Sequence, residues 1–313
     1  MIKNKGLIKR FRHLSEYIVF LVFSSIIRFL SAETVFQLGQ SIGRIAFMGG
    51  GKRKKIAMIN LDIAFGDTKS AQEKQRIVKQ SFIQLAVLFL QCIWMFKDPK
   101  TRVHELITEK PEGVDILNQC LDRGKGVFFL TAHYGNWEAM GILHGYLGVS
   151  QLNSIVRRLD NPLLDKAVLN FRTISGNDIF YRDESPMKIV RALKNNQCVA
   201  VMMDQNTAKG GLFVNFFGMK AATARSVAML SYRTGAAILP LFSYPIGHGK
   251  YRIEYGPELK LNKTGDKTAD IQDWTQKCED FLESVIRTQH EPWMWGHRRW
   301  KTRPSDEQGK KVY

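Results

Sequence analysis

The chain has 313 residues, 44% of them hydrophobic, which is enough for one large folded core. It carries 46 Lys and Arg against 29 Asp and Glu, a net charge of +17, which favours polyanionic neighbours: nucleic acid, anionic lipid headgroups or an acidic protein. Its four cysteines are widely spaced, with no C-x-x-C and no Cys/His metal-ligand spacing, which indicates reduced, mostly buried thiols in a cytosol-facing protein.

The N-terminal segment combines basic and apolar stretches. Residues 1–13 are basic, and residues 17–30 are apolar apart from Ser24, Ser25 and Arg28. This run lacks the cleavage site of a signal peptide and is shorter than the roughly 20 residues that span a bilayer. We therefore expect a helix that lies in a membrane surface or inserts steeply into it, with its cations on the cytoplasmic side. A buried helix of a soluble domain is the alternative interpretation.

A weaker amphipathic pattern continues over residues 31–48. We expect residues 1–50 to form membrane-anchoring helices and residues 51–313 to form an α/β domain. The glycines and cations of residues 49–55 predict a flexible basic hinge, although a solvated loop explains them equally well.

A long apolar helix is expected next. Ser70 and Glu73 have the spacing of a capping box, and the apolar pattern that follows extends to about Phe96. Asp98 and Pro99 end it.

From about residue 112 the pattern alternates between strands and helices. Strands are predicted at residues 126–132, 152–157, 198–203, 236–243 and 250–255. Helices are predicted at residues 136–147, 162–173, 186–195, 223–234 and about 270–289. This alternation predicts an α/β fold with a central, mostly parallel sheet flanked by helices.

Charged side chains stand where three of these strands end. They are His133, the pair Arg157 and Arg158, and Asp204. Because ligands of open α/β sheets bind at the carboxyl ends of the strands, we expect the functional site to lie there.

The absence of several catalytic motifs limits the reactions expected at the site. It has no nucleophile-elbow serine, no phosphate-binding loop and no H-E-x-x-H zinc motif. His133 and Glu138 remain, and we expect Glu138 to accept the Nδ1 proton so that Nε2 deprotonates an alcohol attacking a thioester. N–H groups around Gly135 and Asn136, at a helix N-terminus, are expected to hold the developing oxyanion. A strand-end histidine capped by a nearby glutamate is the alternative.

Six segments carry a family pattern. They are TAHYGNWE, VRRLDNPLLD, MMDQNTAKGGLFVNFFG, ATARSVAML, TGAAILP and PWMWGHRRWK. Their order resembles that in the bacterial lipid A biosynthesis acyltransferases, within the lysophospholipid acyltransferase superfamily, over nearly the whole chain. The resemblance implies a membrane-bound enzyme that moves a fatty acyl chain from acyl carrier protein to a hydroxyl of a lipid A precursor. It places that enzyme at the cytoplasmic face of the inner membrane.

The resemblance also implies roles for individual residues. His133 and Glu138 match the family's catalytic dyad, which works without a covalent acyl-enzyme, a metal or a cofactor other than the acyl carrier protein co-substrate. The wider phospholipid acyltransferases usually have aspartate at the second position, so Glu138 favours the lipid A branch. The family also resembles acyltransferases for mannosylated phosphatidylinositol, so another glycolipid or a lysophospholipid stays open as acceptor.

Further candidates for substrate binding flank the dyad. Arg157 fits the family's arginine and is expected to bind an acceptor phosphate, with pairing to Asp160 or Asp165 as the alternative. Asp204 and Gln205 resemble the family's Asp-Gln pair and are expected to orient an arginine or the acceptor; a helix or turn cap is the alternative for Asp204.

The last basic and aromatic segment suits a membrane interface. Arg298 is expected at a headgroup boundary, together with Trp293, Trp295, His297, Arg299 and Trp300. A solvated basic tail packed by tryptophans is the alternative.

The expected partners are acyl carrier protein, an anionic glycolipid or phospholipid substrate, and the membrane, with no nucleic acid. A nucleic-acid-binding protein would explain the charge but not the apolar N-terminal stretch, and zinc-finger and RNA-recognition signatures are absent. The sequence is also compatible with a thioesterase that uses the same base, or with a non-catalytic membrane-surface protein.

Overall fold

The fold is built around one twisted sheet, seen in a computed structural model that describes residues 2–182, 184, 186–307, 309 and 312–313. Within these residues the sheet has the strand order β3-β2-β4-β1-β7-β8. The strands are β1 (Val127–Thr131), β2 (Leu152–Val156), β3 (Asp178–Tyr181), β4 (Cys198–Met202), β7 (Ala237–Gly247) and β8 (Lys250–Tyr255). Every pair is parallel except β7 with β8. The predicted α/β class with a mostly parallel sheet is confirmed.

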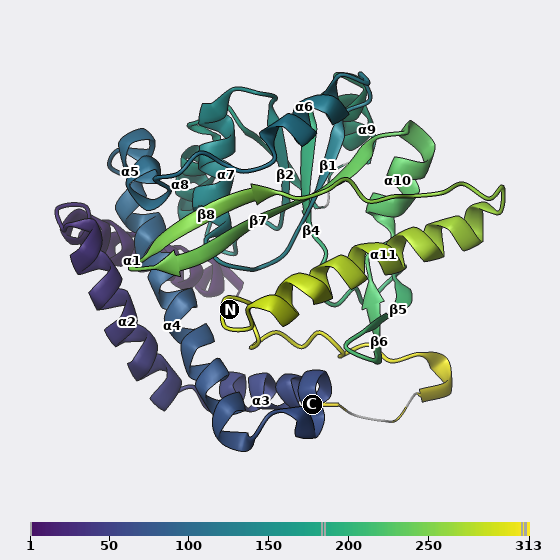
Figure 1. Cartoon of the computed structure of the whole chain (residues 1–313). Coiled ribbons are helices and arrows are strands. Elements are labelled where there is room, and N and C mark those ends of the chain that lie inside the picture. The colour runs from purple at the N-terminus through teal and green to yellow at the C-terminus, as the bar shows by residue number, and fades with distance from the viewer. Residues whose placement is uncertain (1, 183, 185, 308, 310–311) are drawn as a thin grey trace.

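Helices cover both faces of the sheet (Figure 1). They are α6 (Val114–Leu121), α7 (Trp137–Leu147), α8 (Pro162–Thr173), α9 (Pro186–Lys194), α10 (Ser226–Thr234) and α11 (Lys267–Thr288). Because successive strand residues point to opposite faces, Phe128 and Leu130 of β1 join one buried cluster while Val127 and Phe129 join the other. Helix α7 packs on the second cluster, and α9, α10 and α11 pack on the first.

Shorter elements complete the described chain, and the sequence patterns did not predict them. They are α5 (Pro99–Leu106), the hairpin of β5 (Leu212–Phe216) and β6 (Met219–Thr223), and η2 (Ser305–Glu307), in addition to α6 and β3.

The N-terminal region is almost entirely helical. It consists of α1 (Ile2–Ile27), α2 (Ala32–Met48), α3 (Gly51–Phe65), η1 (Gly66–Thr68) and α4 (Ala71–Met95). The predicted capping box is present, with the Ser70 hydroxyl accepting from the Glu73 N–H. The hinge predicted at residues 49–55 is wrong, because α3 begins at Gly51. Lysine and arginine are good helix formers, and the helix they open buries Ile56 and Leu61.

Helix α1 exposes an unusual amount of apolar surface. Its large apolar side chains that are at least half exposed are Leu7, Ile8, Phe11, Ile18, Val19, Val22 and Ile26. The helix contacts the body of the protein through Asn161 at the start of α8, whose side-chain amide donates to the His13 carbonyl. Among the described residues, the one helix long and apolar enough to cross a membrane is α4, and half of that apolar stretch is buried inside the protein.

Helices α2 and α4 cross at very short range. A β-carbon on Gly43 would lie 2.4 Å from the Cα of Ile83, and one on Gly39 would lie 2.8 Å from the Cα of Val87. Two backbones approach this closely only where one of them carries no side chain.

Replacing Gly43 with alanine should therefore destabilise the protein. The added methyl group must push the α4 backbone away, which costs about 1–3 kcal/mol in well-packed cores and outweighs the better helix propensity of alanine. Urea unfolding followed by circular dichroism in detergent measures the change. Ser41→Ala, on the exposed face of α2, is the matched control, and equal midpoints for the two variants would contradict the prediction.

The C-terminal segment returns to the α3 region, where the terminus lies beside α3 (Figure 1). The Tyr313 hydroxyl donates to the Asn60 side-chain carbonyl. Trp293, Trp295 and Trp300 are each at most 1% exposed. The headgroup-boundary prediction for these tryptophans is wrong, because they pack in the core against Phe216 and Phe217 rather than facing outward.

Candidate active site

The site is formed where β1 and β4 end side by side. His133 follows β1, Asp204 follows β4, and the two strands are parallel neighbours. Asp204 Oδ2 accepts the backbone N–H of His133 at 2.9 Å, while Asp204 Oδ1 lies 2.9 Å from His133 Nδ1. The carboxylate thus fixes both the main chain and the ring of His133, and Nδ1–H is the tautomer that it favours.

Asp204 is held as a carboxylate. It is 2% exposed, and its Oδ2 also accepts from the indole N–H of Trp293 at 2.9 Å. Burial raises the pKa of Asp204, but the charge of His133 and the hydrogen bonds from His133 and Trp293 outweigh burial and lower this pKa to about 2. Asp204 therefore stays ionised throughout the neutral range.

The pKa of the His133 imidazole is shifted in the opposite direction, upward. Burial lowers its pKa, yet the charge and hydrogen bond of Asp204, helped by the charge of Glu138, raise the pKa above its ordinary value. The side chain is 20% exposed, and His133 lines the main cavity. Nε2 lies 3.2 Å from the Gln205 side-chain nitrogen, and Trp137 packs edge-to-face on the ring. The structure thus presents a basic nitrogen to the cavity.

Glu138 has a different partner from the one expected. In the first turn of α7 its carboxylate forms a two-pronged ion pair with Arg172 of α8, with Nε donating at 2.9 Å and Nη2 donating to the other oxygen. It also accepts from the indole N–H of Trp137 at 3.2 Å. The prediction that Glu138 accepts the Nδ1 proton of His133 is wrong in this structure, because Asp204 occupies that position. Glu138 and His133 nevertheless line the same cavity.

The expected oxyanion donors are also engaged elsewhere. The N–H of Gly135 donates to the Pro292 carbonyl at 3.3 Å, and the N–H of Asn136 donates to the Ser243 hydroxyl at 3.2 Å. Gly135 has φ 57°, and a β-carbon there would lie 1.8 Å from the Ser243 carbonyl oxygen. Asn136 is fully buried and caps α7 through the Ala139 N–H. Both residues shape the turn after His133, and the oxyanion role predicted for their N–H groups is wrong in this structure.

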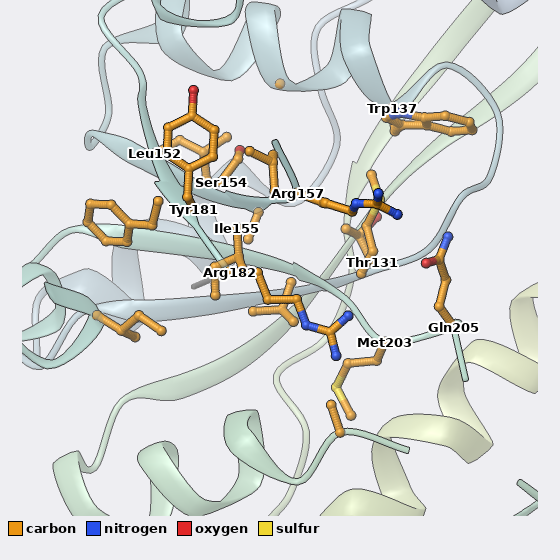
Figure 2. A pocket seen from close by; sticks show the side chains of 18 of the residues that line it. Thr131, Trp137, Leu152, Ser154, Ile155, Arg157, Tyr181, Arg182, Met203 and Gln205 are labelled. Atoms are coloured by element: carbon orange, nitrogen blue, oxygen red, sulfur yellow. The ribbon is translucent and has the colours of Figure 1, made fainter. Parts of the chain in front are cut away.

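One large cavity opens beside His133, with a volume of about 570 Å³. It is bounded by residues of β1, β2, β4, α7, α9 and α10, and this volume falls in the range of ligand-binding pockets. Figure 2 shows Arg157 and Arg182, from the ends of β2 and β3, with their guanidinium groups directed toward the side of the cavity where Gln205 lies.

Of the two arginines predicted to bind substrate, Arg157 and Arg298, only Arg157 lies at the cavity. Arg157 lines the cavity, its side chain is 80% exposed, and it pairs with Asp160 at 3.2 Å, as the alternative to phosphate binding requires. Phosphate binding by Arg157 stays a prediction. Arg298 lies outside the residues that line this cavity, and its guanidinium rests over the ring of Tyr313. The structure does not bring Arg298 to the site.

Two contributors to the site were not predicted to lie there: Arg172, for which the sequence analysis made no prediction, and Trp293, which was expected at a membrane interface. Arg172 lies 34 positions after Glu138 and reaches it only because α8 packs against α7. Trp293 belongs to the C-terminal segment and reaches Asp204 through the fold. Neither has a local sequence signal, since both pairings are long-range.

An α/β sheet that presents a carboxylate-held histidine to a large cavity defines a class of protein: an enzyme equipped with a general base. Sequence comparison supplies the particular family. The model of the bacterial lipid A biosynthesis acyltransferase family matches residues 4–302, and the chain belongs to this family.

Individual relatives are similar at modest identity. The chain is 27% identical over 273 residues to a lipid A biosynthesis palmitoleoyltransferase of Escherichia coli K12, covering 86% of each chain. It is 26% identical over 287 residues to the lauroyltransferase of the same organism, covering 88% of each. It is also 26% identical over 212 residues to a phosphatidylinositol mannoside acyltransferase of Mycolicibacterium smegmatis, covering 65% of this chain and 67% of that one.

Proposed function

We propose that this protein is a membrane-bound O-acyltransferase that moves a fatty acyl chain from acyl carrier protein to a hydroxyl of a lipid A precursor. The observation that carries the proposal is the buried Asp204 carboxylate on His133 Nδ1, which leaves Nε2 as the basic atom at the cavity. Membership of the acyltransferase family supports the same chemistry. Because some relatives are named for mannosylated phosphatidylinositol, a related glycolipid is the second candidate acceptor.

The proposed reaction is a direct transfer. The acceptor hydroxyl oxygen bonds to the thioester carbonyl carbon while its proton passes to His133 Nε2. The tetrahedral intermediate then expels the carrier's thiolate, which takes the proton back from the imidazolium and leaves as a thiol. The C–S bond is replaced by a C–O bond, so no metal, nucleotide or covalent acyl-enzyme is required. Asp204 stabilises the imidazolium, as a carboxylate beside a general base does.

Glu138 keeps a proposed catalytic role through its charge and position. Its carboxylate lines the cavity with His133 and contributes to the raised pKa of that histidine. Arg172 holds the carboxylate at two points, so the Glu138 side chain is fixed in direction. We expect this pair to orient the acceptor hydroxyl toward Nε2, with Gln205 contacting the same nitrogen from another side.

Two arginines at the cavity offer positive charge to the anionic parts of the substrates. Arg157 and Arg182 border the cavity, and guanidinium groups bind phosphate at two points. The net charge of +17 suits both an acidic carrier protein and an anionic membrane. Such an association weakens with salt, so a carrier-protein affinity that is equal at low and high ionic strength would contradict this part of the proposal.

Product analysis tests the proposal directly. The purified protein is incubated with labelled acyl carrier protein and either a lipid A precursor or a mannosylated phosphatidylinositol, and the lipids are identified by mass spectrometry. We expect an acylated glycolipid. Free fatty acid without acylated lipid would show a thioesterase instead, and no consumption of the thioester would refute acyl transfer.

The exposed apolar side chains of α1 should bind the cytoplasmic surface of the inner membrane. Changing Phe11 and Val19 together to aspartate should weaken binding to anionic vesicles at least about tenfold, because burying one such side chain in an apolar phase contributes about 1.5–3 kcal/mol. Vesicle co-sedimentation measures the change. Ser15→Asp adds charge on the same helix without removing an apolar group, so it should lose much less. Unchanged binding by the double variant would place the membrane contact elsewhere.

A further inference from the structure

Two glycines on one face of α7 differ sharply in their surroundings. Gly141 and Gly145 lie four residues apart, one helical turn from each other. A β-carbon on Gly145 would lie 2.3 Å from the Ser175 hydroxyl and 2.6 Å from the Ser175 carbonyl oxygen, so close packing requires glycine there. A β-carbon on Gly141 would have no neighbouring atom within 4 Å, and Gly141 lines the cavity.

Neither packing nor backbone conformation accounts for glycine at position 141. Glycine is unfavourable inside a helix, where alanine is better tolerated. Gly141 lies in the middle of α7 and is not among the glycines with positive φ. What the missing side chain leaves is open space in the cavity.

That space lies one helical turn from Glu138 along α7, and the close contact at Gly145 lies one turn further along the helix. The part of the cavity beside α7, called the α7 branch, is lined there by residues from Trp137 to Ile142, a segment about 7.5 Å long. The sheet contributes small side chains to the wall of the same cavity, Ser154 and Ala200.

The end of the α7 branch away from Glu138 is bounded by a polar side chain, that of Asn177. The side-chain amide of Asn177 donates to the Gly141 carbonyl at 2.7 Å and also lines the cavity. The side-chain carbonyl oxygen of Asn177 is buried and has no hydrogen-bond partner among the described residues. A longer acyl chain would have to displace the Asn177 side chain and break its hydrogen bond to α7, which is unfavourable. An acyl chain is therefore expected to end before Asn177.

We infer that Gly141 determines the length of the acyl chain that the enzyme accepts, because it leaves room for hydrocarbon between α7 and the sheet. The inference rests on the acyl transfer proposed above. It assigns the branch along α7 to the donor chain and leaves the side bordered by Arg157 and Arg182 to the anionic acceptor.

The test compares acyl carrier proteins that carry octanoyl, lauroyl, myristoyl and palmitoyl chains, with one glycolipid acceptor. In Gly141→Leu the ratio of kcat/KM for palmitoyl over lauroyl should fall about tenfold or more, since hydrophobic pockets discriminate on this scale. Gly141→Ala should shift the ratio less, with an unchanged or higher Tm, so the inference stays testable if the leucine variant fails to fold. Ala224→Leu adds bulk to the α10 side of the same cavity and is the matched control; it should keep the wild-type order of chain lengths.

An unchanged ratio in both folded Gly141 variants would overturn the inference, and so would an equal shift in Ala224→Leu. These outcomes leave the proposed acyl transfer intact as long as the wild-type protein acylates the glycolipid. If the wild-type protein releases only free fatty acid, the transfer proposal fails, and the length profile of that hydrolysis still tests Gly141.

Discussion

Replacing His133 with alanine should lower kcat for acyl transfer by about 10²–10⁴-fold, the usual contribution of a positioned general base. The reason is geometric: Nε2 of His133 is the basic atom that Asp204 presents to the cavity. Rates should be measured with labelled acyl carrier protein under saturating acceptor, so that losses in binding and in chemistry are separated.

The control for this variant is His104→Ala, because His104 is exposed on α5 outside the residues that line the cavity. It should retain wild-type rates. Circular dichroism and vesicle binding should be unchanged in both variants. A His133→Ala protein that folds, binds membrane and transfers at the wild-type rate would show that another group removes the proton.

Replacing Asp204 with asparagine should also lower the rate steeply, by about 10²-fold or more, because the amide no longer holds the ring with the same tautomer or stabilises the imidazolium. His133 acts as a base only when neutral, so the wild-type kcat/KM should fall as the pH drops through its raised pKa. Removing the carboxylate removes the main cause that raises this pKa. The acid limb of the pH profile should therefore move to lower pH.

The pH profile distinguishes this role from a merely structural one. The contacts of Asp204 lower its pKa to about 2, so its own titration lies outside the assay range and does not contribute to the acid limb of the wild-type profile. Glu283→Gln on α11 is a suitable control, since it removes a carboxylate that pairs with Arg287 away from the cavity. An acid limb that stays in place in Asp204→Asn would show that the carboxylate does not tune His133.

Local patterns predicted the elements that bury a regular face. The strands around residues 127–131 and 198–202 are continuous apolar runs, and the helix after Ser70 has a capping box, so each carries its own signal. Strand β3 has four residues and only one buried side chain, so the segment is too short to show an alternating pattern. Helix α3 was missed because glycines and cations on its first turn resemble a loop, while its stability comes from packing on distant residues.

In the site, too, local patterns predicted some residues but not the contacts between distant segments. His133 and Asp204 were expected at strand ends, and parallel pairing of β1 with β4 brings them together. Their direct pairing was not predicted, since strand order is not encoded locally. Glu138 was assigned to His133 because the two are close in sequence, yet Arg172 from α8 offers it two hydrogen bonds. Charge-assisted pairs of this kind form across the fold, where sequence spacing gives no guide.

The placement of the C-terminal segment has a consequence for biosynthesis. The backbone N–H of Met294 donates to the His133 carbonyl, Trp293 holds Asp204, and Ser81 of α4 holds the Trp293 carbonyl. A nascent chain leaves the ribosome from its N-terminus, so the exposed apolar helix α1 emerges before His133, and Trp293 and Met294 emerge after it. Until Trp293 and Met294 have been translated, His133 and Asp204 lack these supports. The proposed membrane contact of α1 can thus form before the site around His133 is complete.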